Sequence, residues 1–177
     1  MELDALLEEL RSYPGLARKS QVGAWARRFR VGRRAGESAA AGPGDDAGAV
    51  PVEGGYVLLA AESIRGDLFR DPGFAGFCSV TVNVNDIYAM GGRPLGLATV
   101  VHAGGFTDEA REGFLSGLEA GLAHYGLPLL GGHTSPGGES PAVAVSVAGF
   151  AAALLPGDGS RPGDRLLAAL DLEGRPR

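Results

Sequence analysis

The chain has 177 residues, of which 45% are apolar, and a formal net charge of −5. This length suits one domain with a hydrophobic core, and the apolar share excludes disorder throughout the chain. The negative charge argues against a nucleic-acid or anionic-membrane partner, because attraction to phosphates needs clustered cations. The acidic start, MELDALLEEL, is unlike a secretion signal, and the single cysteine, Cys78, is compatible with a reducing compartment. We therefore expect a cytoplasmic protein.

The first forty residues predict two helices and a loop. Leucines in LDALLEEL (3–10) fall on one helical stripe, and this helix is expected to end before Pro14. Ser20 is a candidate N-cap for a second helix, whose apolar stripe is Val22, Trp25, Ala26 and Phe29. Residues 31–44 are rich in glycine and alanine, and they predict a mobile loop.

The middle of the chain predicts a β-hairpin and a long helix. The hairpin strands are AGAVPV (47–52) and YVLLAAES (56–63), joined across a Glu-Gly-Gly turn. Asp71-Pro72 is a favourable start for a helix that ends at Gly91-Gly92. Its middle, SVTVNVND (79–86), alternates like a strand, but the caps favour a helix.

The last part of the chain predicts strand, helix, strand and strand. The strands are PLGLATVVHA (94–103), LPLLGG (127–132) and PAVAVSVAGF (141–150), and the helix runs from a Thr107 cap to Gly126. The order ββαβαββ indicates an α+β fold, with a mixed, mainly antiparallel sheet covered by helices on one face. Because the strands are apolar on both faces, we expect a homodimer through the uncovered face, with Val145 or Val147 at its interface.

Polar residues from separate segments predict a site for a hard cation. Asp45 and Asp46 lie in a glycine-rich loop, and Glu62 lies near the end of the following strand. On the long helix, Asn83 and Asp86 are three residues apart, and so lie on neighbouring parts of one face. Mg²⁺ prefers oxygen ligands, usually one or two carboxylates together with substrate phosphates, and would compensate the adjacent like charges.

A predicted turn after a strand, Gly131-Gly132-His133-Thr134, adds backbone amides to this set. Each motif also has an ordinary alternative. GDD is more often a solvated turn, a helical Asn or Asp usually faces water, and His133 is more often a loop residue than a ligand. Cys78 is expected to be a small core residue. The chain has no P-loop, G-x-S-x-G or H-E-x-x-H motif.

The chain resembles the amino-terminal domain of the aminoimidazole ribonucleotide (AIR) synthase superfamily in three ordered motifs: GPGDDAGAV (42–50), VNVNDIYAMGGRPLGLATVV (82–101) and LLGGHTSPGGE (129–139). This superfamily includes selenophosphate synthetase, thiamine-monophosphate kinase and a hydrogenase maturation factor that dehydrates a carbamoyl group. The motifs are most similar to selenophosphate synthetase and uncharacterised AIR synthase-related proteins. The resemblance runs from about Gly42 to the end of the chain.

The resemblance implies an enzyme that binds ATP and Mg²⁺ between two domains and dimerises by closing two sheets into a barrel. Asp45 and Asp86 match metal-binding aspartates of the family, with Asp46 beside the first as a candidate catalytic residue. Glu62, where relatives often have aspartate, is a third candidate metal ligand. The implied nucleotide-binding residues are Gly44, Asp45, Asp46, Glu62, Asn83, Asp86, Gly131, Gly132, His133 and Thr134.

Selenophosphate synthetase carries a reactive cysteine or selenocysteine near its amino terminus, followed closely by a lysine. Here the first 77 residues contain no cysteine, and Lys19 is the candidate match for the lysine, and so a candidate catalytic residue. The substrate stays open, because family members act on aminoimidazole precursors, selenide, thiamine phosphate and carbamoyl groups.

We divide the chain into a helical segment and loop (1–41), an ATP- and Mg²⁺-binding α+β domain (42–155), and a linker or the start of a second domain (156–177). The first hypothesis is an ATP-dependent phosphoryl-transfer or phosphate-activation enzyme, similar to selenophosphate synthetase or thiamine-monophosphate kinase. The alternative is a non-catalytic nucleotide-binding or dimerisation module. Clustered carboxylates favour the enzyme, and a chain that stops where the second domain is expected favours the module.

Overall fold

The computed structural model describes residues 2–17, 22, 28 and 44–170. Two helices precede the main body, α1 (Leu3–Ser12) and α2 (Pro14–Ala17), so the first helix ends before Pro14 as predicted. Most of the second predicted helix and all of the predicted loop except Gly44 lie outside the described residues. None of the helices in the described part of the chain has the length and apolar character that crossing a membrane requires.

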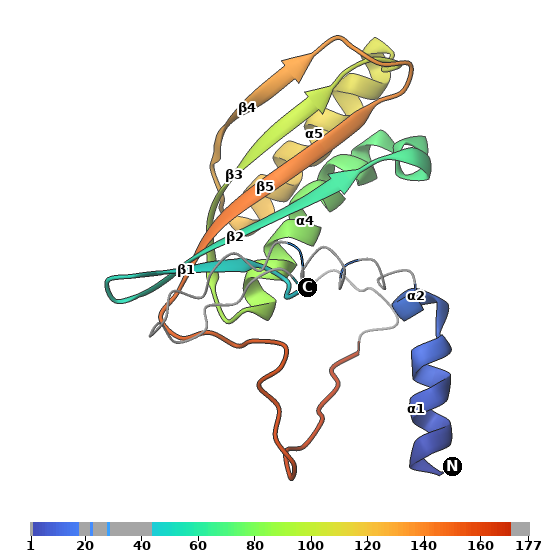
Figure 1. Cartoon of the computed structure of the whole chain (residues 1–177). Coiled ribbons are helices and arrows are strands. Elements are labelled where there is room, and N and C mark those ends of the chain that lie inside the picture. Colours follow the sequence, from blue (N-terminus) through green and yellow to red (C-terminus); the bar gives the residue numbers. More distant parts are fainter. Residues whose placement is uncertain (1, 18–21, 23–27, 29–43, 171–177) are drawn as a thin grey trace.

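One five-stranded sheet forms the centre of the fold, with strand order β1-β2-β5-β3-β4 (Figure 1). β3 and β4 run parallel, and the other three neighbouring pairs are antiparallel. The α+β class and the mixed, mainly antiparallel sheet are therefore confirmed. The strands are β1 (Gly48–Val52), β2 (Gly55–Ile64), β3 (Arg93–His102), β4 (Leu129–Ser135) and β5 (Ala142–Ala151).

Two long helices, α4 (Pro72–Ala89) and α5 (Asp108–Tyr125), pack on one face of the sheet, and a short 3₁₀ helix, η1 (Gly66–Arg70), leads into the first of them (Figure 1). The predicted caps explain where the helices begin. An Asp71 carboxylate oxygen accepts the Phe74 N–H at 2.9 Å, and the Thr107 hydroxyl accepts the Ala110 N–H at 3.1 Å. The alternating segment 79–86 is helical, because these caps and tertiary packing outweigh its strand propensity.

Glycines bring α4 and α5 unusually close together. A Cβ atom on Gly76 would overlap the backbone carbonyl oxygen of Phe114, and one on Gly117 would overlap the carbonyl oxygen of Gly73. Side chains at these positions would push the two helices apart. The glycine content of this region therefore serves helix packing.

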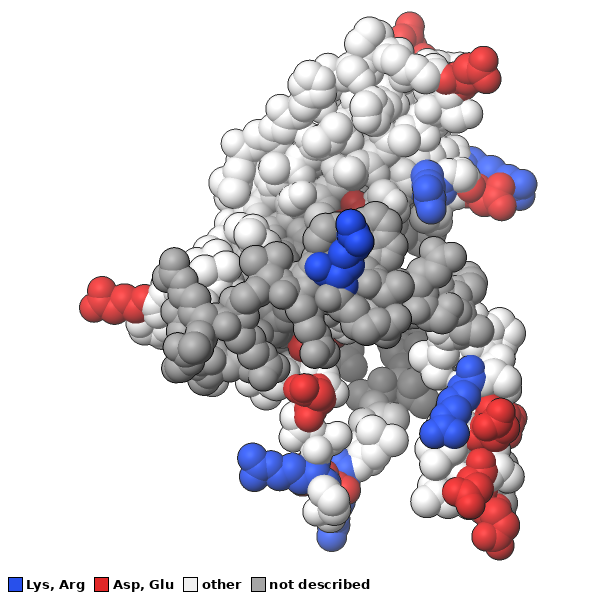
Figure 2. Space-filling view, viewed as in Figure 1, with Lys and Arg blue, Asp and Glu red and all other residues white. Residues whose placement is uncertain are grey.

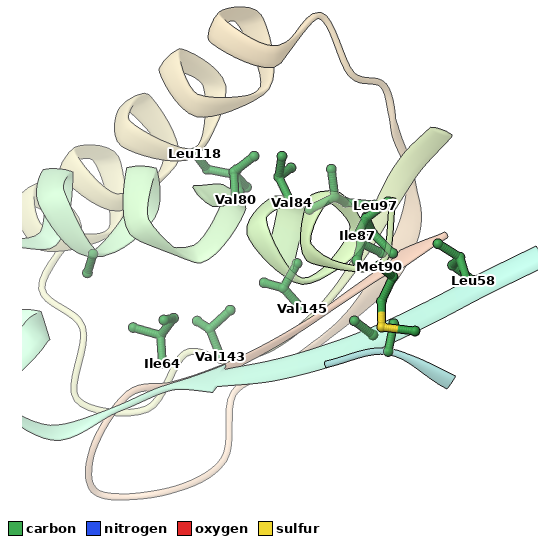
Figure 3. Packing of buried hydrophobic residues seen from close by; sticks show 14 of the residues in the cluster. Leu58, Ile64, Val80, Val84, Ile87, Met90, Leu97, Leu118, Val143 and Val145 are labelled. Carbon is green, nitrogen blue, oxygen red and sulfur yellow. The ribbon is translucent and has the colours of Figure 1, made fainter. Parts of the chain in front are cut away.

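The core lies between the sheet and α4, with Phe114 and Leu118 of α5 completing it (Figure 3). Figure 3 shows Val145 of β5 directed toward α4, with Val84 and Ile87 on the facing helix. Val145 and Val147 are both fully buried. The prediction that either residue lies at a dimer interface is wrong, because the valines of β5 point toward the helices.

The alternate side chains form the outer face of the sheet, which is the face turned away from α4 and α5. On this face Leu59 of β2 is 54% exposed, Val100 of β3 is 38% exposed and Leu130 of β4 is 63% exposed. Figure 2 shows few charged side chains over β3, β4 and β5 on this side. The described residues thus leave the outer face apolar and largely open to solvent.

Candidate functional site

The acidic loop before β1 is anchored by one small buried residue. Ala47 is only 2% exposed and belongs to the core, whereas Asp46 is exposed and Asp45 is half-buried. Gly44, with a positive φ of 115°, turns the chain into this loop. The Asp46 N–H donates to an Asp45 carboxylate oxygen at 3.1 Å. Burying Ala47 therefore fixes the loop and leaves the two aspartates at the surface.

Glu62 lies on β2, beyond the part of this strand that pairs with β1. The ladder begins with Gly48 opposite Leu59, and residues 46 and 47 form a bend before it. Glu62 therefore lies three positions beyond the last residue of β2 that pairs with β1. Neither Asp45 nor Glu62 takes part in an ion pair with the described residues.

The candidate residues on α4 have different environments. Asn83 is fully buried: its Nδ2 donates to the carbonyl oxygen of Ser79 at 2.9 Å, and its Oδ1 has no hydrogen-bond partner within the described chain. In this conformation Asn83 offers no surface to a ligand from solvent. Asn85 is exposed and Asp86 is half-buried near the carboxyl end of the helix. Asp86 is therefore the candidate on α4 that combines a carboxylate with access to solvent.

The GGHT motif belongs to a strand, so its prediction as a turn is wrong. Gly131, Gly132, His133 and Thr134 all lie within β4, and His133 pairs with Val100 of β3. Gly132 has a steric reason to lack a side chain, because a Cβ there would overlap the Thr99 carbonyl oxygen. Sequence alone could not show this close approach, since it involves a strand thirty residues away.

The sheet order separates this motif from the acidic loop. β4 is one edge of the sheet and β1 is the other. Four strand spacings of about 4.8 Å place them about 19 Å apart. Within one copy of the chain, the structure therefore does not join the GGHT motif to the acidic loop. Lys19 lies outside the described residues.

The donor set fits a hard cation only in part. Among residues 44–170 and the described N-terminal positions, no three His, Cys, Asp or Glu side chains are grouped closely enough to hold a metal. Asp45, Glu62 and Asp86 supply carboxylate oxygens, the ligand type that Mg²⁺ prefers. Mg²⁺ commonly binds one or two carboxylates and takes its remaining ligands from water and substrate phosphates. The residues therefore fit a cation that arrives with a phosphate ligand.

Cys78 has the environment expected of a packing residue. It is half-buried on α4, and burial raises the pKa of its thiol. Because the thiolate is the reactive form, the raised pKa lowers its nucleophilicity near neutral pH. Cys78 is not among the fully buried residues of the core, so its role as a small core residue stays a prediction.

One contact that sequence reasoning missed connects the acidic loop to the segment after β5. The backbone N–H of Gly157 donates to the Asp45 carboxylate oxygens at 3.3 and 3.2 Å. Gly157 lies 112 residues further along the chain, and glycine-rich segments occur throughout the sequence. No pattern in the sequence could therefore have identified this pair.

Comparisons with known proteins give a family match and two similar proteins. Residues 44–151 match the family described as AIR synthase related protein, N-terminal domain. An uncharacterised protein of Synechocystis is 38% identical over 99% of this chain and 54% of its own length. The thiamine-monophosphate kinase of Pyrococcus horikoshii is 33% identical over 75% of this chain and 44% of its own length. The chain thus spans about half the length of these two relatives.

A solved structure supports the same fold. AaThiL complexed with AMPPCP and TMP superimposes with a TM-score of 0.67, at 21% sequence identity, over 80% of this chain and 44% of AaThiL. This degree of likeness establishes the architecture of the sheet and helices.

Proposed function

Because the chain belongs to the family of AIR synthase related proteins through their N-terminal domain, we propose that it is the nucleotide- and metal-binding part of an ATP- and Mg²⁺-dependent enzyme. The reaction is phosphoryl transfer or phosphate activation. The related thiamine-monophosphate kinase and the AMPPCP bound to AaThiL support this class. The substrate that receives or loses the phosphoryl group is left open.

The observation that supports this proposal is that Asp45, half-buried in the acidic loop, and Glu62, exposed on β2, have no ion-pair partner among the described residues. Both are candidate ligands of a cation, and Asp86 on α4 is the third. Mg²⁺ bound there would neutralise phosphate charge and hold the phosphates in place. Asp46, exposed beside Asp45, is the candidate to orient the group that reacts with the phosphate.

We assign residues 42–155 to this binding domain and 156–177 to a linker or the start of a second domain. The exposed fractions of Leu166, Leu167 and Leu170 are 99%, 87% and 80%. Leucines so exposed are typical of a segment that a further domain covers. We assign residues 1–41 to a separate preceding segment, of which the structure describes the helices α1 and α2.

The outer face supports a homodimer in which a second copy covers Leu59, Val100 and Leu130. Two sheets packed face to face lie about 10 Å apart. If the two-fold axis runs along the strands, β4 of one copy lies opposite β1 of its partner. This arrangement would bring the GGHT motif of one copy toward the acidic loop of the other, which one copy alone does not do.

Calorimetric titration with Mg·ATP tests the proposal. Asp45→Asn and Asp86→Asn are each expected to weaken binding about tenfold or more, because each removes a charged ligand. Glu53→Gln, an exposed carboxylate in the hairpin turn, is the matched control and should bind as the wild type does. Unchanged affinity in both aspartate variants would contradict the proposed site. Tight Mg·ATP binding without ADP formation at any added substrate would favour the non-catalytic module.

A further inference from the structure

The segment that follows β5 contacts both elements that carry the proposed metal ligands. We call residues 152–157 the strap. The Leu155 N–H donates to the Met90 carbonyl oxygen at 3.1 Å, just beyond the end of α4. The Leu155 side chain also covers Gly91, where a Cβ would stand 2.9 Å from Leu155 Cγ. Leu154 packs against the core and fixes the path of the strap.

Two residues later the strap reaches the acidic loop. The Gly157 N–H is shared between the two carboxylate oxygens of Asp45, at 3.3 and 3.2 Å. A Cβ on Gly157 would lie 3.2 Å from the Asp45 Oδ1, so the backbone approaches the carboxylate closely because residue 157 is glycine. Together with the Asp46 N–H, this contact limits the orientations that the Asp45 side chain can adopt.

The other end of the strap is close in sequence to Asp86. The Met90 N–H donates to the Asp86 carbonyl oxygen at 3.3 Å, so Asp86 and Met90 span the last turn of α4. The strap therefore bridges the helix end that carries Asp86 and the loop that carries Asp45. Asp45 and Asp86 are 41 residues apart in the sequence, and β1, β2 and η1 lie between the acidic loop and α4.

We propose that the strap is a positioning element for the metal site, in which the Gly157 N–H orients the Asp45 carboxylate and Leu155 holds the end of α4 relative to it. This inference rests on the proposed function, because it requires that Asp45 and Asp86 bind the cation. An N–H donor that holds the carboxylate in one orientation reduces the conformational freedom lost when a cation binds. By reciprocity, a cation at Asp45 orders the strap, which leads directly into residues 158–170. Binding at the site is thereby coupled to residues 158–170.

The test uses the ¹⁵N-labelled chain titrated with Mg·ATP, followed by amide NMR, and compares Gly157→Pro with Gly157→Ala. Proline removes the N–H donor. Alanine keeps the donor, and its Cβ requires only a small shift of the Asp45 side chain. We expect the Gly157 and Asp46 amide signals of the wild type to shift together with one dissociation constant. Gly157→Pro should weaken Mg·ATP binding about three- to tenfold, the loss expected for one hydrogen bond. Gly157→Ala should remain within about twofold of the wild type.

The outcomes separate this inference from the proposed function. If folded Gly157→Pro binds Mg·ATP with wild-type affinity while Asp45→Asn binds it more weakly, the proposed role of the strap is wrong and the proposed metal site stands. Wild-type affinity in Asp45→Asn and Asp86→Asn, or no Mg·ATP-dependent shift in the wild-type chain, would overturn both. If Gly157→Pro does not fold, the same titration of Leu155→Ala tests the proposed role of the strap. That role predicts that Leu155→Ala binds Mg·ATP more weakly and that the Gly157 amide signal still shifts. Unchanged Mg·ATP affinity in Leu155→Ala would contradict it.

Discussion

The contact between α4 and α5 gives the sharpest test of the fold, through Gly117→Ala. Gly→Ala inside a helix normally stabilises a protein by about 0.5–1 kcal/mol, because glycine loses more backbone entropy on folding. At Gly117, however, the added Cβ meets only backbone atoms of Gly73, with the carbonyl carbon at 2.8 Å and the Cα at 3.0 Å. Backbone atoms cannot rotate away, so the helices themselves must separate.

Overpacking of this kind costs about 1–3 kcal/mol, and a clash with backbone belongs at the upper end of that range. After the gain in helix propensity, we expect a net loss of about 2 kcal/mol. For a chain of this size, 1 kcal/mol changes Tm by about 2–4 °C, so Tm should fall by about 4–8 °C.

The matched control is Gly113→Ala, one turn earlier on α5. Its added Cβ would stand 3.5 Å from the Pro72 Cβ, an ordinary contact, so this variant should be as stable as the wild type or slightly more stable. Thermal unfolding followed by circular dichroism at 222 nm measures both variants. Equal Tm values for Gly117→Ala and Gly113→Ala would refute the close helix contact.

The remaining predictions concern assembly and the thiol. Leu59→Asp on the outer face should convert the dimer into a folded monomer, as measured by light scattering. Val147→Asp should instead unfold the chain, because it buries an unpaired carboxylate. A wild-type chain that is monomeric at micromolar concentration would contradict the dimer. Because burial raises the pKa of Cys78, iodoacetamide should alkylate it more slowly at pH 8 than it alkylates a free cysteine, and equal rates would argue against a packing role. Cys78→Ala should cost about 1 kcal/mol in the free energy of unfolding and leave Mg·ATP binding unchanged, whereas weaker binding in the folded variant would place the thiol near the site.

Local signals in the sequence were sufficient for the helices. Segment 79–86 alternates like a strand, yet Asp71 and Pro72 at one end and the glycine pair at the other correctly predicted α4. Capping residues act through hydrogen bonds to their immediate neighbours, so they can be recognised without tertiary information. The same holds for Thr107 and for Gly126, whose φ of 63° ends α5.

The orientation of β5 could not be predicted in the same way. Alternation showed that Val143, Val145 and Val147 share one face, but both faces of the strand are apolar. Which face meets the helices depends on how the sheet and α4 pack, and here the valines turn inward while the smaller Ala144 and Ser146 turn outward. The expectation of an apolar outer face stands, with different residues on it.

For similar reasons, only the local arrangements in the candidate site could be predicted from the sequence. The hairpin that follows the acidic loop and carries Glu62 was predicted from its two strands and the glycine turn between them, which are local signals. The position of the GGHT motif depends on the strand order of the whole sheet, and the contact between Gly157 and Asp45 depends on the path of the chain after β5. Neither long-range arrangement leaves a local mark in the sequence.

The central proposal is that the carboxylates of Asp45 and Asp86, with Glu62 as the third candidate, bind the cation that accompanies ATP. Paramagnetic broadening by Mn·ATP tests it most directly, because amide signals nearest the ion disappear first at low occupancy. The account predicts that the amides of residues 44–47, 61–63 and 85–87 broaden before the rest of the chain, and that Asp45→Asn abolishes this pattern. Broadening centred on any other part of the chain, or the same pattern in Asp45→Asn, would contradict it.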